Sequence, residues 1–219
     1  MTALMGLLRP LQVFNDVVLR FGRGVGVVAI ALMVVFILYQ VVMRYAFNNA
    51  QPWPEEAARF MMLWMTGLLA PLAYRRGGFV AIDMVEAALP RFAAGILGLA
   101  LLLLSLLVLL VGLQLGYKHI GSGCLFKSST LWLPFTLKFT MPIPLTDLDL
   151  TLCTRGTHVY SFTWGWTKMP LTLSFLGVYV GVVMLTLVNI ELILRSVIGM
   201  LGGQDRLRPM IVADLPEAD

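Results

Sequence analysis

Charged side chains are scarce in this sequence. Only 13% of its 219 residues are Asp, Glu, Lys or Arg, whereas 59% are hydrophobic. The mean hydropathy is +0.86. A soluble globular domain carries about 25% charged residues, so the composition excludes an ordinary soluble protein. We attribute the net charge of +4 to membrane topology and expect no nucleic-acid partner.

Residues that commonly carry chemistry are also few. The chain has two histidines, His119 and His158, and two cysteines, Cys124 and Cys153. All four fall in one loop, so no pair of helix-borne imidazoles exists to ligate haem. The sequence contains no glycine-rich phosphate loop, HExxH or GxSxG. We therefore predict a protein that is not an enzyme, with no catalytic residue, no metal site and no cofactor of its own.

Four segments are apolar enough to cross a bilayer: residues 24–43, 57–74, 92–115 and 169–193. A helical span needs about 20 such residues. None of the four shows the period-2 alternation of an outer-membrane barrel. The sequence therefore predicts an all-α integral membrane protein with four transmembrane helices, forming a single membrane domain over residues 1–219.

The N-terminal segment predicts a further, interfacial helix that leads into the first span. Its apolar residues fall on one helical face, opposite a polar face; they are Val13, Phe14, Val17, Val18 and Phe21, against Asn15, Asp16 and Arg23. Such an amphipathic pattern is typical of a helix that lies in the membrane surface. The alternative is an unstructured cytoplasmic tail. A signal peptide is not expected, because no small-residue cleavage site follows.

The distribution of Lys and Arg predicts the orientation. Basic residues precede the first span, separate the second from the third, and follow the fourth, and short cytoplasmic segments carry such an excess. Both termini should therefore be cytoplasmic. The connection 44–56 and the long segment of about 117–168 should be periplasmic.

The long segment contains a pattern that predicts a β-hairpin. Leu148, Leu150 and Leu152 alternate with polar residues, and so do Tyr160 and Phe162 after a turn at Gly156. An isolated hairpin is marginal in water, so its apolar face should rest on the membrane or on a partner.

The two cysteines lie in this same segment. An oxidising periplasm favours a disulfide between Cys124 and Cys153. Two free thiols are an alternative. A metal site of these cysteines with His119 and His158 is another, although its spacing is not that of known zinc motifs.

The stretch QPWPEEAARFMMLWMTG places charges at the start of an apolar helix. Pro54 suits the first turn of a helix, and the helix dipole favours Glu55 and Glu56 there. Arg59 follows Glu55 by four residues and Glu56 by three, so it can pair with either carboxylate. A well-capped helix start thus accounts for the charges.

Span interiors carry small residues and almost no ionisable ones. Gly67, Gly177 and Gly181 predict close helix packing. Arg59 and Glu191 are near enough to span ends to reach the interface. An independent ion path is therefore not favoured.

The run RYAFNNAQPWPEEAARFMMLWMTGLLAPLAYRRGGFVAID resembles the small membrane subunit of tripartite ATP-independent periplasmic (TRAP) transporters, of the DctQ or SiaQ type. The residues in one ungapped match are Arg44, Tyr45, Phe47, Trp53, Glu55, Glu56, Arg59, Trp64, Ala70, Ala73, Arg75, Val80, Ile82 and Asp83. The chain departs from the family pattern at Gly67, Leu69, Pro71 and Phe79.

This resemblance implies a small permease subunit of the bacterial inner membrane. It would scaffold a large DctM-type subunit of about a dozen spans, which carries the Na⁺ sites, while a DctP-type periplasmic protein delivers an organic acid. The residues implied at the subunit interface are Arg44, Trp53, Glu55, Glu56, Arg59, Trp64 and Asp83. The alternatives are a membrane anchor or assembly subunit of a respiratory or redox complex, and a self-contained four-helix carrier.

Overall fold

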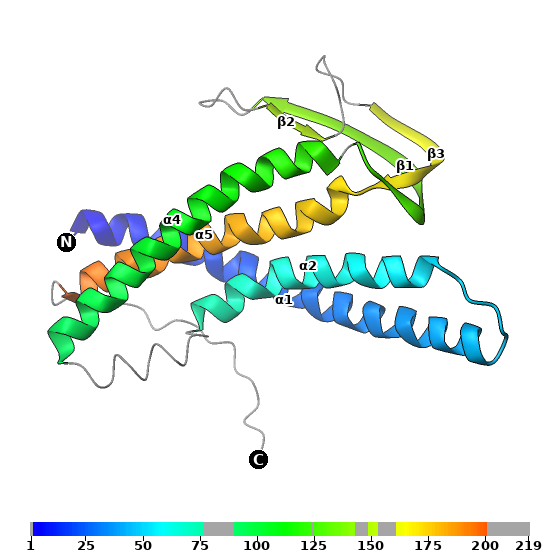
Figure 1. The fold of residues 1–219 in the computed structure, drawn as a ribbon. Helices are drawn as coiled ribbons and strands as arrows, with labels where there is room; N and C mark the ends of the chain where they lie inside the picture. Colours follow the sequence, from blue (N-terminus) through cyan, green and yellow to red (C-terminus); the bar gives the residue numbers. More distant parts are fainter. Residues whose placement is uncertain (1, 77–89, 124, 143–148, 153–160, 201–219) are drawn as a thin grey trace.

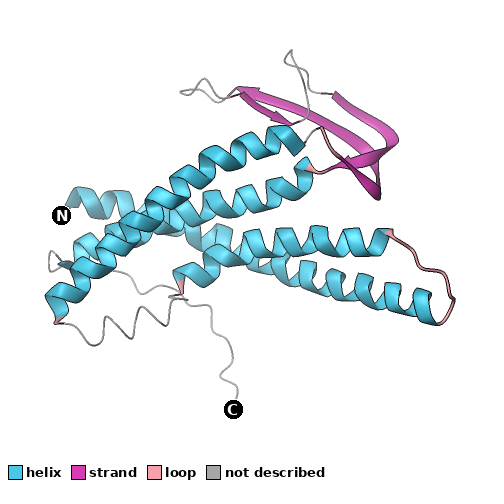
Figure 2. Ribbon diagram, viewed as in Figure 1, coloured by secondary structure: helices cyan, strands magenta, loops and turns pink. Residues whose placement is uncertain are grey.

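The computed structural model describes residues 2–76, 90–123, 125–142, 149–152 and 161–200. Within them it has long helices and a small sheet at one end of the helical bundle (Figures 1 and 2). The elements are α1 (Thr2–Tyr45), α2 (Trp53–Arg75), α4 (Arg91–Gly123), β1 (Lys127–Pro142), β2 (Asp149–Leu152), β3 (Ser161–Pro170) and α5 (Thr172–Met200).

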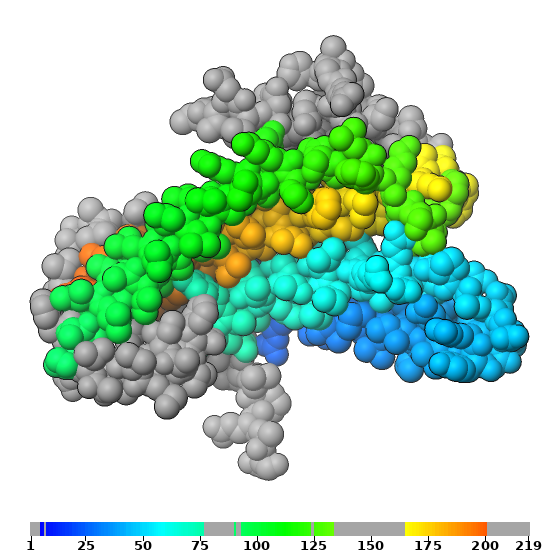
Figure 3. Space-filling view, viewed as in Figure 1, coloured from blue at the N-terminus to red at the C-terminus, as the bar shows by residue number. Residues whose placement is uncertain are grey.

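Helix α5 lies at the centre of the bundle and contacts α1, α2 and α4. Figure 3 shows it between α4 and α2. Helices α1 and α2 form a hairpin, whose loop lies at the opposite end of the molecule from the N-terminus (Figure 1). The end of α2, the start of α4 and the end of α5 all lie toward the N-terminal end of the bundle.

Three of these helices are long and apolar enough to cross a membrane: Leu8–Tyr45, Ala93–Gly123 and Thr172–Met200. They correspond to three of the four predicted spans, except that residues 169 and 170 end β3 and the last helix begins only at Thr172. The chain is a multi-pass membrane protein. The second predicted span corresponds to α2, which is helical as expected but is not among these three.

The separate interfacial helix is a wrong prediction, because α1 runs unbroken for 44 residues. Its amphipathic character is correct, but the polar side faces the bundle. Asn15 is 1% exposed, whereas Phe21 is 72% exposed. The reason is that partners for the polar groups of this segment lie on α2 and α5, so the apolar side is left outward.

The buried positions of α5 are mostly small or polar. They are Thr172, Ser174, Gly177, Gly181, Thr186, Val188, Asn189, Glu191 and Ile198. Membrane helices pack through such residues because apolar side chains gain little by leaving lipid. At the crossing of α2 and α5 a Cβ added to Gly67 would lie 2.2 Å from the carbonyl oxygen of Gly177. The predicted close packing at Gly67, Gly177 and Gly181 is thus confirmed.

The sheet has the strand order β2-β1-β3, and both pairings are antiparallel. Strands at Leu150–Leu152 and around Phe162 were predicted, but the hairpin that joins them directly is wrong, since β1 lies between β2 and β3. Strand β1 escapes prediction because a proline within a run argues against a strand. Pro134 is accommodated at a register shift between Leu133 and Phe135.

Several predicted features lie outside the described residues. They are Asp83, Cys124, Cys153, Gly156 and His158.

Candidate functional site

The first turn of α2 carries the charges that the sequence singled out. Pro52 precedes the helix, and Pro54 is buried in the first turn. Arg59 pairs with Glu55, with 2.5 Å between Nη2 and Oε1. Both side chains are exposed, at 74% and 57%, so solvent screens the pair and its contribution to stability is small.

Glu56 has a different role from its neighbour. Its Oε2 accepts hydrogen bonds from the backbone nitrogen of Thr130, at 3.1 Å, and from the Thr130 hydroxyl. Ser128 Oγ accepts from the backbone nitrogen of Leu131 at 2.8 Å and holds this turn of β1. Burial by itself raises the pKa of Glu56, but the hydrogen bonds from Thr130 and Ser128 outweigh it and lower the pKa. Glu56 therefore ties the start of α2 to the base of the sheet.

Replacing Glu56 with glutamine is expected to loosen this junction. A hydrogen bond to a charged group contributes about 1.5 kcal/mol at the low end of its range, so the segment 127–133 should exchange its amide hydrogens about tenfold faster. Because the folded pKa is lowered, the stabilisation is complete above the unfolded pKa and is lost as the pH falls through the folded value. Hydrogen–deuterium exchange of the full chain at several pH values, corrected for intrinsic rates, measures both effects.

The matched control is Glu55→Gln, one residue away. It removes an exposed carboxylate that pairs with Arg59 and leaves Thr130 untouched. If the amides of the segment 127–133 exchange equally slowly in the two variants, the proposed role of Glu56 in holding β1 against α2 is contradicted.

The two tryptophans make contacts inside the chain. Trp53 packs against α1, with its ring centre 5.9 Å from that of Phe36 and 5.5 Å from that of Tyr39. Trp64 Nε1 donates to the carbonyl oxygen of Leu173 at 3.1 Å. A Cβ added to Gly177 would lie 2.9 Å from the Trp64 ring. The contacts of Trp64 with α5 explain why a tryptophan, here partly buried, occurs about three turns inside the helix.

Arg44 is exposed at the end of α1, and its guanidinium lies 5.9 Å from the ring centre of Tyr45. The structure therefore brings Arg44, Glu55 and Arg59 to the surface at the loop end of the α1–α2 hairpin. It does not describe Asp83.

An ionic cluster is buried where α1, α2 and α5 meet. Arg75 Nη2 lies 2.8 Å from Glu191 Oε1, and Arg75 also pairs with Asp16. Glu191 is fully buried; it accepts from Asn15 Nδ2 at 2.7 Å and from Arg195 Nε at 3.2 Å. Two guanidinium groups and two carboxylates thus balance in charge. This cluster joins the N-terminal part of α1 to the bundle.

Sequence reasoning missed this cluster. It assigned Arg75 to the cytoplasmic charge excess, Asp16 to a surface helix and Glu191 to a span end that reaches the interface. The available signal was that ionisable groups in apolar helices usually face the bundle interior and pair with one another.

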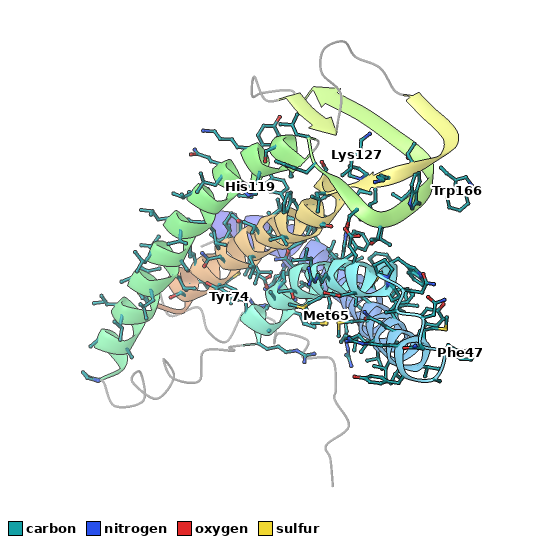
Figure 4. All side chains as sticks on the ribbon, turned by 45° about the vertical axis from the view of Figure 1, so that its right-hand side comes forward. Phe47, Met65, Tyr74, His119, Lys127 and Trp166 are labelled. Atoms are coloured by element: carbon teal, nitrogen blue, oxygen red, sulfur yellow. The ribbon has the colours of Figure 1, made fainter. Side chains whose placement is uncertain are left out.

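A second, uncharged network joins α2, α4 and α5. The Tyr74 hydroxyl donates to Asn189 Oδ1 at 3.0 Å and lies 3.1 Å from Ser105 Oγ. Asn189 Nδ2 donates to the carbonyl oxygen of Leu102 at 3.2 Å. Figure 4 shows Tyr74 pointing into the bundle. These polar groups all act between helices of this chain.

Among the described residues, no group of three His, Cys, Asp or Glu side chains could hold a metal ion. His119 packs edge-on against Phe175, with 5.3 Å between ring centres. The described polar and aromatic residues of the site therefore either pack the helices together or lie on the surface.

Comparison with known families shows to which protein family the chain belongs. A family model described as the DctQ component of tripartite ATP-independent periplasmic transporters matches residues 33–143, just over half of the chain. This chain belongs to the DctQ family. The match begins within α1 and includes α2, α4 and β1, so it contains the start of α2 and Trp64 itself, but not Leu173 and Gly177, which Trp64 contacts on α5. The DctQ protein is a transporter component and not an enzyme.

Two curated relatives agree with this family. A TRAP transporter small permease protein of Haemophilus influenzae is 34% identical over 68 residues, which are 31% of this DctQ chain and 42% of the relative. The sialic acid TRAP transporter small permease protein SiaQ of Vibrio cholerae is 23% identical over 134 residues, which are 61% of this chain and 78% of the relative. The chain thus spans less than half of the Haemophilus protein. No solved structure matches the chain significantly.

Proposed function

We propose that this DctQ protein scaffolds a large DctM-type membrane subunit in the bacterial inner membrane. The complex would take up an organic acid, coupled to Na⁺ in the large subunit and delivered by a DctP-type periplasmic binding protein. Family membership supports the general role. In this proposal other subunits bind the substrate and the ions. This agrees with the described polar side chains of the chain, which mainly contact other residues of the chain itself.

The observation that carries the scaffold role is the exposed apolar surface of α1. Large hydrophobic side chains are at least 37% exposed along the whole helix; they are Val13, Phe14, Val17, Phe21, Val27, Val28, Ile30, Leu32, Val34, Val35, Ile37, Leu38, Val41 and Val42. At 1.5 Å per residue, 44 residues extend for about 66 Å, about twice the hydrocarbon thickness. A helix of this length offers a long face to a larger membrane protein.

In this proposal α2 is the remaining span of a four-helix domain. Its 23 residues extend for about 34 Å, against about 30 Å of hydrocarbon. Its charged residues lie near the two ends: Glu55 and Glu56 in the first turn, Arg59 in the second, and Arg75 in the last. Four crossings would place both termini on the cytoplasmic side, in agreement with the excess of basic residues there.

The proposed contact with the large subunit centres on Arg44, Glu55 and Arg59, because they are exposed at one end of the hairpin. Trp53, Glu56 and Trp64 would shape this surface through their contacts with α1, β1 and α5. Asp83 stays an expectation from the family pattern.

Affinity purification of the tagged full chain from native membranes tests the proposal. A much larger membrane protein should copurify. Exchanging the charges of the pair, with Glu55→Lys and Arg59→Glu together, preserves the internal ion pair but inverts the charges offered to a partner. It should reduce recovery of the large subunit about tenfold, equivalent to about 1.4 kcal/mol.

Lys118→Gln, which changes an exposed charged residue of α4 outside the proposed contact surface, is the control and should leave recovery unchanged. If no large membrane protein copurifies with the unaltered chain, the scaffold role is refuted. If it copurifies equally with the exchanged pair, only the assignment of Arg44, Glu55 and Arg59 fails.

A further inference from the structure

The base of the sheet is fixed where two apolar helices end. Helix α4 ends at Gly123, and β1 begins at Lys127; β3 ends at Pro170, and α5 begins at Thr172. The backbone nitrogen of Leu171 donates to the carbonyl oxygen of Phe126 at 3.1 Å. The position of this junction is therefore determined by the helices.

The length of α5 places the junction at a membrane boundary. Glu191 marks the level of the ionic cluster, and Thr172 precedes it by 19 residues (191 minus 172). At 1.5 Å per residue this distance is about 29 Å, close to the hydrocarbon thickness of about 30 Å. With the ionic cluster at one edge of the hydrocarbon, the base of the sheet lies at the other edge, among the lipid headgroups.

Large apolar side chains are exposed at this level. Leu125 is 68% exposed, Phe126 61%, Trp132 53% and Trp166 72%. Trp132 lies opposite Lys168 in the sheet, and the ammonium of Lys168 is 5.8 Å from the centre of the Trp132 ring. Because alternate residues of a strand point to the same side, Trp166 shares this face with Lys168. Figure 4 shows Trp166 pointing away from the bundle.

Basic residues predominate around this face, although the carboxylate of Glu56 lies at Thr130, two residues from Trp132. Residues 116–142 and 161–171 contain Lys118, Lys127, Lys138 and Lys168 but no Asp or Glu. Tryptophan is enriched at membrane interfaces, where its ring meets both apolar and polar surroundings. Lysine near the membrane surface is attracted to anionic lipids. The combination of both residue types matches a phospholipid headgroup layer.

We propose that Leu125, Phe126, Trp132, Trp166 and Lys168 form a lipid-binding face that inserts into the headgroup layer and favours anionic phospholipids. The sheet between α4 and α5 is thereby supported by the membrane through its exposed tryptophans. Glu56 holds the adjacent turn of β1 against α2 and so fixes the position of this face along the membrane normal. The inference does not depend on the transported substrate or on the partner subunits.

Tryptophan fluorescence of the full chain in vesicles tests this proposal. The vesicles are phosphatidylcholine with or without phosphatidylglycerol, and part of the lipid carries bromine at a shallow or a deep acyl position. Subtracting the emission of Trp132→Phe and of Trp166→Phe isolates each ring. Both rings should be quenched more by shallow than by deep bromine, and little by aqueous iodide. Adding phosphatidylglycerol should increase the quenching, and Lys168→Gln should reduce that increase.

Trp64→Phe is the control, because Trp64 is packed between α2 and α5 and should not respond to phosphatidylglycerol. Quenching of the unaltered chain by iodide and by bromolipid is measured first. The conclusion that tryptophans of this chain insert into lipid therefore does not depend on the folding of a variant. Strong quenching of Trp132 and Trp166 by iodide, with none by bromolipid, would overturn the proposal, because it would show that the face lies in water. An unchanged response in Lys168→Gln would refute the preference for anionic lipid.

Discussion

Replacing Glu191 with leucine is expected to destabilise the protein by about 3–5 kcal/mol, the usual cost of removing one partner from a buried ion pair. Glu191 is fully buried and compensates both Arg75 and Arg195. Without it, Asp16 is the only carboxylate of the cluster that remains for two guanidinium groups. Unfolding of the purified chain in mixed detergent micelles, followed by circular dichroism, gives the change in the free energy of unfolding.

Two further variants separate charge from packing. Ile190→Leu changes a partly exposed neighbour in the same helix and should cost much less. Adding Arg75→Met to Glu191→Leu removes one uncompensated charge and should restore part of the lost stability, so the double variant is more stable than the two single effects predict. A loss below about 1 kcal/mol for Glu191→Leu, or simple additivity with Arg75→Met, would contradict the pairing.

Gly67→Ala is the second change with a large expected effect. Its Cβ would lie 2.2 Å from the carbonyl oxygen of Gly177, which is a backbone atom and cannot rotate away. Helices α2 and α5 would have to separate, and the hydrogen bond from Trp64 to Leu173 would lengthen. Forcing extra volume into a packed site costs about 1–3 kcal/mol. Unfolding in the same micelles measures the loss.

Two glycines of α1 provide a graded control. An added Cβ at Gly24 meets nothing within 4 Å, and at Gly26 it meets only the side chain of Leu69. Gly24→Ala should be neutral or stabilise the helix by up to about 1 kcal/mol, and Gly26→Ala should fall between the two. If Gly67→Ala and Gly24→Ala are equally stable, the close crossing is wrong.

The helices could be predicted from the sequence because length and hydropathy are local properties. Gly67, Gly177 and Gly181 could be assigned to packing for the same reason. The pairing of Arg59 with Glu55 was also accessible, since four residues of helix bring the two side chains together. That Arg44, Glu55 and Arg59 meet a partner subunit stays a prediction.

Long-range pairing could not be predicted from local patterns. Glu56 has its partner at Thr130, and Asn15 has its partner at Glu191, far along the chain. Strand β1 was missed because Pro134 argues against a strand, and the sheet tolerates it through a register shift. The sequence showed which groups needed partners, but the fold selected the partners.

The joint between α2 and α5 has a mechanical consequence. Its attachment points along α5 include the glycine crossing at Gly181 and the ionic cluster at Glu191, which are separated by about 15 Å at 1.5 Å per residue. Two helices that are in contact at a single point can rotate relative to each other about that point. Two separated contacts prevent this rotation. Helices α2 and α5 should therefore move together as one rigid unit. In the proposed complex, such a rigid pair would give the large subunit a fixed surface to pack against.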